Sequence, residues 1–307
     1  MNDISFYFEP FQLQVDDDEL SLSKDLLIHD ENGFPEIKEK GLALIYVPEY
    51  RSSHKPTEDT NTGFLNSFAE LYKGDGWDFS LYCLGTIKPG EKIEDTYFAV
   101  AQVVAELIKN EILPIVIGGS QDLTMACYKA FEHLERTINI CSVDSRLNVG
   151  SPETPITNHG YVSHLLLQRP CYLFNYANIG LQRPLVPKRE MQLFERLYFD
   201  FCRLGAFNSD FRLAEPHLRN SDLITIDLNS IKSTDIDPVA FREVNGFKSD
   251  QICQIARYAG MSDKSSCFGV FELDPNQNKQ ADDLIAQILW YFIDGFSARV
   301  GDFPIGS

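Results

Sequence analysis

The sequence predicts an α/β fold in which a mainly parallel sheet lies between two layers of helices. Short apolar runs rich in β-branched residues, such as Ile115-Val116-Ile117, recur along the chain and end in turn residues. Such runs are typical of buried parallel strands. Between them lie segments of about ten to fifteen residues with helical periodicity, and this alternation indicates a parallel sheet covered on both faces.

The predicted elements follow one another from residue 41 onward. Residues 1–40 combine acidic and aromatic positions, and we expect an arm packed on the domain, because a disordered tail holds few aromatic residues. The first clear strand is 41–47, and 48–63 is expected to be a loop. Later strands are expected at 112–117, 138–143, 172–179, 223–228 and 267–273. Helices are expected at about 94–108, 121–135, 189–198, 250–258 and 281–293.

Two of the helices show why these assignments are made. The helix at 94–108 opens with Glu94 and Asp95, and acidic side chains stabilise a helix N-terminus. The last helix follows the 3.6-residue period closely. Its apolar stripe consists of Ala281, Leu284, Ile285, Ile288, Leu289, Phe292 and Ile293. No linker divides the chain, so residues 41–307 are predicted to form a single domain.

Composition excludes several classes of protein. The formal net charge of −18 repels phosphate backbones and anionic lipids, so we expect neither nucleic acid nor membrane as a partner. No run approaches the roughly 18 apolar residues of a transmembrane helix. The seven cysteines include no Cys-x-x-Cys pair, and the N-terminus lacks a basic signal region. These features favour a reducing, cytoplasmic location.

Polar clusters follow four of the predicted strands. They are Gly118-Gly119-Ser120-Gln121-Asp122, Asp144-Ser145-Arg146-Leu147-Asn148, Asp227-Leu228-Asn229 and Glu272. Ligands of parallel sheets bind at the carboxyl ends of the strands, so these side chains are candidates for one site. A carboxylate that ends a buried strand must be paired, coordinated or face a cleft. Capping of a helix or loop is an equally open role for each aspartate taken alone.

The chemistry of these clusters argues against a two-metal centre. Asp144 and Asp227, with Asn148 and Asn229 nearby, suggest an oxygen-lined pocket. However, Arg146 stays charged and would repel a divalent ion. At about 4 Å and an effective dielectric constant near 20, that repulsion is worth roughly 4 kcal/mol per unit charge. Arg146 would instead neutralise the two aspartates, or hold a carboxylate or phosphate of a ligand.

Two further residues are candidates for contact with a ligand. Glu272 could receive a cationic or amidine group at the end of its strand. His159 follows a proline-containing loop and could line the rim of a pocket, although its position favours a surface-loop histidine. The sequence contains no Gly-x-Ser-x-Gly elbow and no phosphate-binding P-loop, so two common classes of enzyme are excluded.

The order and spacing of the clusters resemble the ureohydrolase superfamily of arginase, agmatinase and formimidoylglutamase. The family motifs read Gly-Gly-Asp-His-Ser, Asp-Ala-His-x-Asp, Ser-x-Asp-x-Asp and Val-Glu-x-Asn-Pro. The corresponding segments here are 118–122, 144–148, 225–229 and 271–275, and the resemblance extends over about residues 41–300. It implies a three-layer α/β/α fold, arginase-like, and a dimanganese site that activates water to attack a guanidinium or formimino carbon.

The resemblance also shows which family ligands are replaced. Of the six metal-ligand positions, only Asp144 and Asp227 keep the family residue. The other four positions hold Gln121, Arg146, Asn148 and Asn229. Glu272 falls at the family's substrate-binding glutamate. The loop 153–157, with the His159-Gly160 step after it, resembles the family's substrate loop.

These observations lead to three functional hypotheses. The first is a divergent formimidoylglutamase-like protein whose dimanganese site is degraded. Such a protein would be a metal-free pseudoenzyme that needs no cofactor and either binds a small polar molecule or acts in assembly. The second is a hydrolase of C–N bonds in linear amidines, with Asp144, Asp227 and His159 as catalytic residues and a reduced manganese site or none. The substrate would then contact Glu272, Arg146, Asn148, Asn229 and Gln121. The third is another enzymatic use of the pocket, with Arg146 holding an anionic substrate group. The resemblance implies a homo-oligomer, since family members commonly form trimers or hexamers.

Overall fold

The computed structural model describes residues 3–11, 13, 18–53, 57, 60–236 and 243–301. Within these residues the strands are β1 Phe8–Glu9, β2 Leu26–Ile28, β3 Gly41–Val47, β4 Ser80–Ile87, β5 Ile112–Gly118, β6 Ile138–Val143, β7 Leu173–Leu181, β8 Asp200–Arg203, β9 Leu223–Asp227 and β10 Cys267–Phe271. They form one ten-stranded sheet of order β1-β4-β3-β5-β10-β9-β6-β7-β8, and β2 also pairs with β4. β1 runs antiparallel to β4, whereas the other pairings are parallel. The mainly parallel sheet is therefore confirmed.

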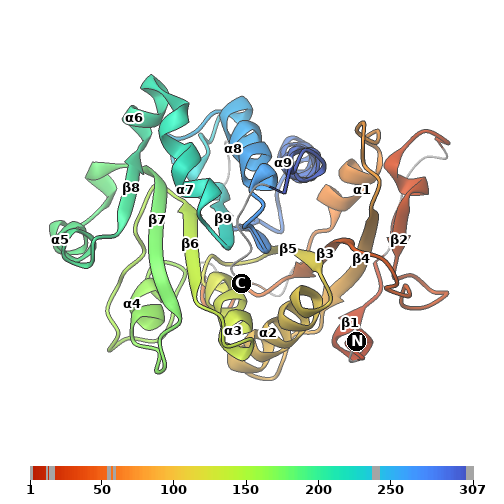
Figure 1. Ribbon diagram of the computed structural model, residues 1–307, viewed down its shortest axis with the longest axis horizontal. Helices are drawn as coiled ribbons and strands as arrows, with labels where there is room; N and C mark the ends of the chain where they lie inside the picture. Colours follow the sequence, from red (N-terminus) through yellow and green to blue (C-terminus); the bar gives the residue numbers. More distant parts are fainter. Residues whose placement is uncertain are drawn as a thin grey trace.

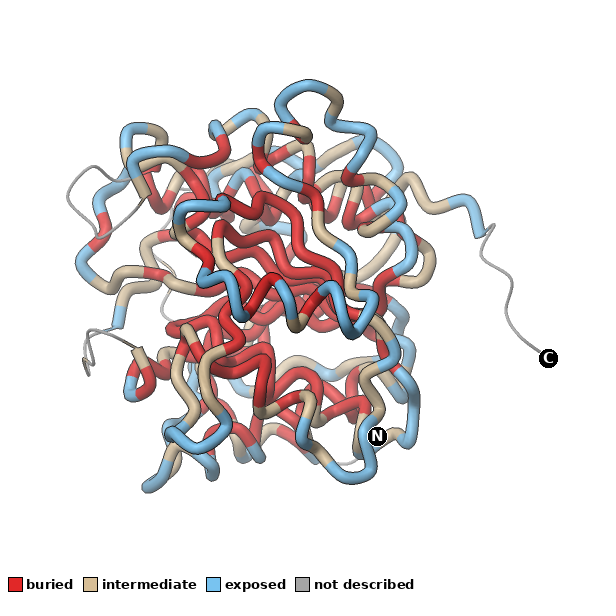
Figure 2. The backbone as a smooth tube through the Cα atoms, turned by 90° about the vertical axis from the view of Figure 1, so that its left-hand side faces the viewer, coloured by how far each residue is buried: buried red, intermediate tan, exposed pale blue. Residues whose placement is uncertain are grey.

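Helices cover both faces of this sheet (Figure 1). Their bounds are α1 Gly63–Ala69, α2 Ile93–Lys109, α3 Leu123–His133, α4 Tyr161–Leu166, α5 Lys188–Leu197, α6 Leu204–Ser209, α7 Glu215–Arg219, α8 Ser249–Met261 and α9 Lys279–Ser297. α1, α8 and α9 pack on one face, and α2, α3 and α4 pack on the other. Figure 2 shows the buried strands between these two layers. The three-layer α/β/α architecture is confirmed.

The pattern of burial explains why the strands and the last helix were predictable. β5, β9 and β10 are buried along their whole lengths, as uninterrupted apolar strands require when helices cover both faces. In α9 every residue of the predicted apolar stripe is buried. Phe268 of β10 stacks on Phe292 of α9, with ring centroids 4.0 Å apart. No helix of the described segments is long and apolar enough to span a membrane.

The structure also contains elements that the sequence analysis did not predict. β4 is the longest of them, and its apolar run is interrupted by Gly85, whose φ is +114°. A Cβ at this position would lie 2.2 Å from the Glu9 carbonyl oxygen, so β1 can approach only a glycine here. Because β1 and β2 both pair with β4, part of the N-terminal arm belongs to the sheet. The domain boundary at residue 40 stays a prediction.

Candidate functional site

Three carboxylates meet at the carboxyl edge of the central strands. Asp227 is the last residue of β9, Asp144 directly follows β6 and Glu272 directly follows β10. These strands are neighbours in the order β10-β9-β6, so their ends present the three side chains together. The carboxyl groups of Asp144 and Asp227 share a hydrogen bond, and each residue is only 2% exposed. The strand-end aspartates of the sequence analysis are therefore adjacent in space.

Asp144 is held by nitrogen donors of its own turn. The backbone N–H of Arg146 donates to Asp144 Oδ1 over 2.8 Å, and Asn148 Nδ2 donates to Asp144 Oδ2 over 2.6 Å. Burial raises the pKa of Asp144 to about 7, and the negative charge of Glu272 acts in the same direction. The carboxyl group is therefore half-protonated near neutrality, because burial penalises its charged form.

Glu272 is surrounded by amide donors from three other segments. Its Oε1 accepts hydrogen bonds from the Gln121 backbone N–H over 2.8 Å and from Asn158 Nδ2 over 3.1 Å. Its Oε2 accepts from Asn229 Nδ2 over 3.0 Å. Burial raises the pKa of Glu272, and the charge of Asp122 contributes to this rise. Glu272 keeps partial exposure, and so it is the site carboxylate that a solute can reach most directly.

Asn158 is a site residue that the sequence analysis missed. It precedes His159, and the only available signal was its place in the Thr157-Asn158-His159-Gly160 step. His159 itself lies at the site, where its Nδ1 is 3.3 Å from Asn148 Oδ1. A chain of contacts therefore runs from His159 through Asn148 to Asp144.

Two of the site residues have a left-handed backbone. The φ angle is 64° at Glu272 and 50° at Asn148. The other described non-glycine residues with positive φ, Glu111, Glu135 and Tyr198, follow the ends of α2, α3 and α5, where this conformation commonly ends a helix. Glu272 and Asn148 instead follow strand ends. Such conformations cost of order 1–3 kcal/mol each and cluster at functional sites.

Gln121 points into the protein interior. It is fully buried, and its Nε2 donates to Thr225 Oγ1 over 3.2 Å and to Ser142 Oγ over 3.4 Å. Its Oε1 has no hydrogen-bond partner among the described residues. The Gln121 side chain thus binds hydroxyl groups of the core, while its backbone N–H holds Glu272.

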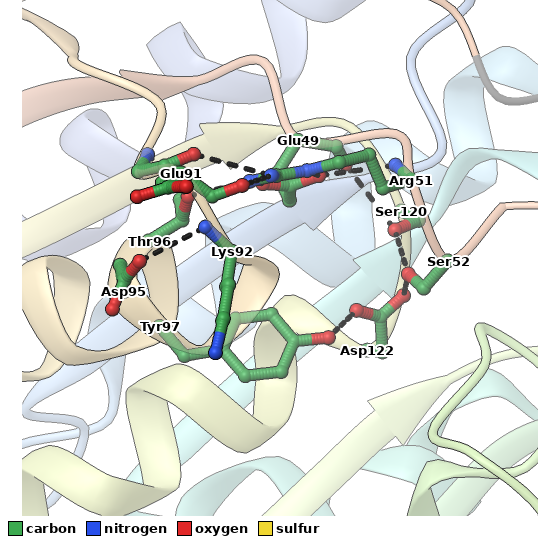
Figure 3. Close-up of polar contacts among 11 residues, drawn as sticks. Glu49, Arg51, Ser52, Glu91, Lys92, Asp95, Thr96, Tyr97, Ser120 and Asp122 are labelled. Atoms are coloured by element: carbon green, nitrogen blue, oxygen red, sulfur yellow. Dashed lines mark hydrogen bonds and ion pairs between the residues drawn. The ribbon is translucent and has the colours of Figure 1, made fainter.

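The residues on either side of Gln121 bind a different segment (Figure 3). Ser120 Oγ lies 2.8 Å from Ser52 Oγ, and Asp122 accepts hydrogen bonds from the hydroxyl groups of Ser52 and Tyr97. Asp122 is fully buried, and burial raises its pKa. The Ser52 backbone oxygen also accepts from the Asn158 N–H over 3.4 Å. This cluster therefore fixes the β5–α3 turn and connects it to Asn158.

Arg146 lies at the rim of the site. Its guanidinium donates to Glu243 Oε1 over 2.8 Å and to the Leu185 carbonyl over 3.3 Å. The contact of Arg146 with Asp144 is made by the backbone N–H, although the positive charge still lowers the pKa of Asp144. The structure thus gives the guanidinium an ion-pair partner, Glu243, that the sequence analysis did not consider.

The residues of the site differ in how far they are buried. Gln121, Asp144, Asn148, Asn158 and Asp227 are buried, whereas Arg146, His159, Asn229 and Glu272 keep partial exposure. Within the described segments, no group of three or more His, Cys, Asp or Glu side chains is arranged to hold a metal ion. The site is therefore a compact network of carboxylates and amides.

Comparison with known proteins identifies the family to which this chain belongs. The Arginase family model matches residues 62–294, whereas no curated protein sequence matches the chain. Formimidoylglutamase from Bacillus subtilis has a similar structure, with a TM-score of 0.79 and 16% identity over 92% of this chain and 94% of that one. Formiminoglutamase from Trypanosoma cruzi with Mn²⁺ gives a TM-score of 0.76 and 16% identity over 85% and 95%. Arginase from Bacillus cereus gives 0.68 and 12% over 83% and 98%. Since the family match covers most of the chain, and similar structures share its sheet and helix layers, the protein belongs to the Arginase family.

Proposed function

We propose that this protein is a metal-free pseudoenzyme of the Arginase family, which uses the carboxylate and amide network to bind a small polar molecule or to support assembly. One observation carries the proposal. Asn148 Nδ2 donates to Asp144 Oδ2 over 2.6 Å, so a nitrogen donor lies against the carboxylate oxygen that a cation would need. An amide N–H and a metal ion cannot both occupy that direction.

The remaining donors do not fit a dimanganese centre either. Manganese prefers carboxylate, carbonyl and water ligands, and the family site that the sequence resembles adds histidine. Here the second oxygen of Asp144 accepts a backbone N–H, and the Gln121 carboxamide donates to core hydroxyl groups. His159 is directed to Asn148. Each family ligand that was replaced has become part of a hydrogen-bond network, which satisfies the buried carboxylates without a cation.

The test is the metal content of purified protein after manganese loading and desalting, measured by elemental mass spectrometry. We expect close to zero manganese per chain. A variant carrying Gln121→His, Arg146→His, Asn148→Asp and Asn229→Asp restores the family ligands and serves as the matched control, with a higher expected manganese content. About one or two manganese ions per chain in the parent protein would overturn the proposal.

A hydrolase of linear amidines is the second candidate. It is favoured by the contacts from His159 through Asn148 to Asp144 and by the partial exposure of Glu272. Turnover of formimidoylglutamate, agmatine and arginine should be assayed with and without manganese. Asp227→Ala is the decisive variant, because a hydrolase that uses the aspartate pair must lose activity with it. Equal rates in parent and variant would remove this candidate.

Three further properties belong to the proposal. We infer that the protein is a homo-oligomer and that it is located in the cytoplasm. A monomer mass measured by light scattering would refute the homo-oligomer. An anionic ligand group on Arg146 would have to compete with Glu243 for the guanidinium. Small carboxylates and phosphate should therefore cause an Arg146-dependent thermal shift only if they displace that ion pair.

A further inference from the structure

The arginines of this chain are concentrated in one part of the sequence. Residues 169–219 contain seven of its 13 arginines but only one of its 14 lysines, and they carry eight basic and five acidic residues. Since the whole chain has a formal net charge of −18, this segment is a local positive region in a strongly acidic protein. Protein–protein interfaces are enriched in arginine and depleted of lysine, so the segment has the composition of a docking surface.

Most of these charges lie on helix α5 and at the strand ends beside it. α5 buries Met191 and Phe194, and the Phe194 ring contacts Tyr176 of β7 edge to face, with ring centroids 5.6 Å apart. The opposite side of the helix is exposed, because residues three or four positions apart lie on the same side. We define the α5 surface by its exposed residues, which are Arg183, Lys188, Arg189, Arg196, Tyr198 and Arg203.

Three arginines of the α5 surface make contacts that do not neutralise their charge. Arg196 and Arg183 donate to backbone carbonyl groups over 3.3 and 2.9 Å. The Arg203 guanidinium lies over the Phe201 ring, 5.8 Å from its centre. None of these contacts with described residues involves a carboxylate. The α5 surface therefore offers positive charge to another molecule.

Tyr198 occupies an unusual position at the end of α5. Its backbone is left-handed, with a φ of 57°, and glycine is the residue most often found in this conformation at helix ends. The residue is 90% exposed, so its ring gains almost no burial within the chain to offset the backbone strain. Exposed tyrosine beside arginine is typical of binding surfaces, in which these residue types provide much of the affinity.

The opposite end of the sheet carries the complementary charge. β8 and β1 are the two ends of the strand order, and Figure 1 shows α5 and β8 on the far side of the molecule from β1 and β2. Residues 1–40, which supply β1 and β2, contain eleven acidic and three basic residues. Glu9 of β1 and Glu31 are exposed, and they flank the hydrogen bond from the Phe11 N–H to the His29 carbonyl. We call the surface of Glu9 and Glu31 the β1 edge.

The two ends of the sheet are far enough apart to act independently. The nine strands from β1 to β8, at a spacing of about 4.8 Å, span roughly 40 Å. In physiological salt, charges are screened over about 8 Å. The net negative charge of the molecule therefore does not prevent the positive end of one copy from attracting the acidic end of another.

We propose that the α5 surface docks the β1 edge of a second copy of this chain. This inference rests on the homo-oligomer of the proposed function and names the two surfaces that form it. The contact joins different surfaces of the two copies, so it is heterologous, and copies joined in this way form a closed ring or an open chain. Every copy carries both surfaces, and their opposite charges steer the encounter.

Sedimentation velocity of the purified full chain, over a range of protein and NaCl concentrations, tests the contact. We expect an oligomer that dissociates as NaCl rises, because salt screens the surface charges. Tyr198→Gly is the most informative variant, since glycine adopts the left-handed backbone freely. Its urea unfolding midpoint should stay the same or rise, whereas the dissociation constant of the oligomer should increase at least about tenfold. A tyrosine kept only for the fold would instead lower the midpoint and leave the association unchanged.

Charge reversal identifies the occupant of the α5 surface. Arg189→Glu combined with Arg196→Glu should abolish self-association. Glu9→Lys combined with Glu31→Lys should abolish it as well. An equimolar mixture of these two variants should associate again, because each contact in the mixture joins opposite charges.

The matched control is Lys109→Glu combined with Lys248→Glu. It changes the net charge as much as the arginine reversal does, at exposed positions outside both surfaces, and should associate like the parent. If the β1-edge variant still associates while the arginine variant does not, the α5 surface docks a different acidic face and the inference is wrong.

Two outcomes separate this inference from the proposed function. A parent oligomer whose dissociation constant is unchanged by Tyr198→Gly and by the arginine reversal would overturn the inference and leave the homo-oligomer standing. A parent that sediments as a monomer at every concentration would overturn both. The manganese content is independent of these results, so the metal-free site is judged separately.

Discussion

Replacing Asn148 by aspartate tests the central hydrogen bond of the site. The change exchanges an N–H donor, 2.6 Å from Asp144 Oδ2, for a carboxylate of nearly the same shape. Asp144 is 2% exposed and Asn148 is 3% exposed, so solvent screens the new repulsion weakly. Two like charges that relax to about 4 Å repel by roughly 4 kcal/mol at an effective dielectric constant near 20. Loss of the charge-assisted hydrogen bond costs about 1.5–3 kcal/mol more.

The repulsive part of this cost depends on pH. Since burial raises the pKa of Asp144 to about 7, its carboxyl group is mostly protonated at pH 5.5 and can donate a hydrogen bond to the new aspartate. At pH 8.5 Asp144 of the parent is mostly ionised, whereas the repulsion keeps one proton on the carboxyl pair of the variant. Holding that proton at a pH about 1.5 units above the parent pKa costs about 2 kcal/mol, and this is the additional loss of stability that we expect. Urea unfolding at the two pH values measures this additional loss. The midpoint and slope of each unfolding curve give the free energy of unfolding.

Asn148→Gly provides the matched control. Glycine adopts the left-handed backbone of residue 148 without strain, and it removes the donor without adding a charge. We expect a loss of stability with a much smaller pH dependence. The free energy of unfolding of each variant is compared at pH 5.5 and pH 8.5. An equal change for Asn148→Asp and Asn148→Gly would refute the close approach of residue 148 to Asp144.

Three further predictions concern the same edge of the sheet. The free energy of unfolding of the parent should fall as pH rises from about 4 to about 7. The raised pKa of Asp144 makes the native state bind more protons than the unfolded state in that pH range. Urea unfolding that shows no fall would contradict this prediction. Tyr97→Phe removes a donor from buried Asp122 and should cost about 1–3 kcal/mol, whereas the exposed Tyr72→Phe should leave the denaturation midpoint unchanged. Arg146→Ala should cost about 1 kcal/mol or less, since its ion pair is partly exposed; a loss of several kcal/mol would mean that the guanidinium neutralises the aspartates directly.

The central strands were predictable because burial on both faces leaves a plain pattern in the sequence. β5 and β10 are uninterrupted apolar runs that end in turn residues. β4 has no uninterrupted apolar run, because Gly85 breaks the run where β1 approaches. The approach of one chain segment to another is a tertiary property, and the residues of β4 alone do not show it.

The candidate site was predictable where the sheet itself brings residues together. The neighbouring strand ends of β6 and β9 place Asp144 beside Asp227, and parallel topology is sufficient to foresee this. Arg146 pairs with Glu243, 97 residues away in the chain, and Asn158 binds Glu272 at a separation of 114 residues. Both contacts depend on loop conformations, which carry no periodic signal in the sequence.

The loop of residues 150–160 begins and ends at two glycines that lie against each other, since a Cβ on Gly150 would be 2.5 Å from the Cα of Gly160. This arrangement has a consequence for protein engineering. Because Gly150 and Gly160 touch, the eleven-residue segment enters and leaves the fold at nearly one point. Loop-closure entropy rises only slowly with length, by about 0.6 kcal/mol for each doubling. Peptides of other lengths can therefore replace the exposed residues 152–155, whereas Ile156 and Asn158 must stay, because they pack against the core and bind Glu272. The tip of the segment is thus open to redesign while its base continues to hold the strand-end carboxylate.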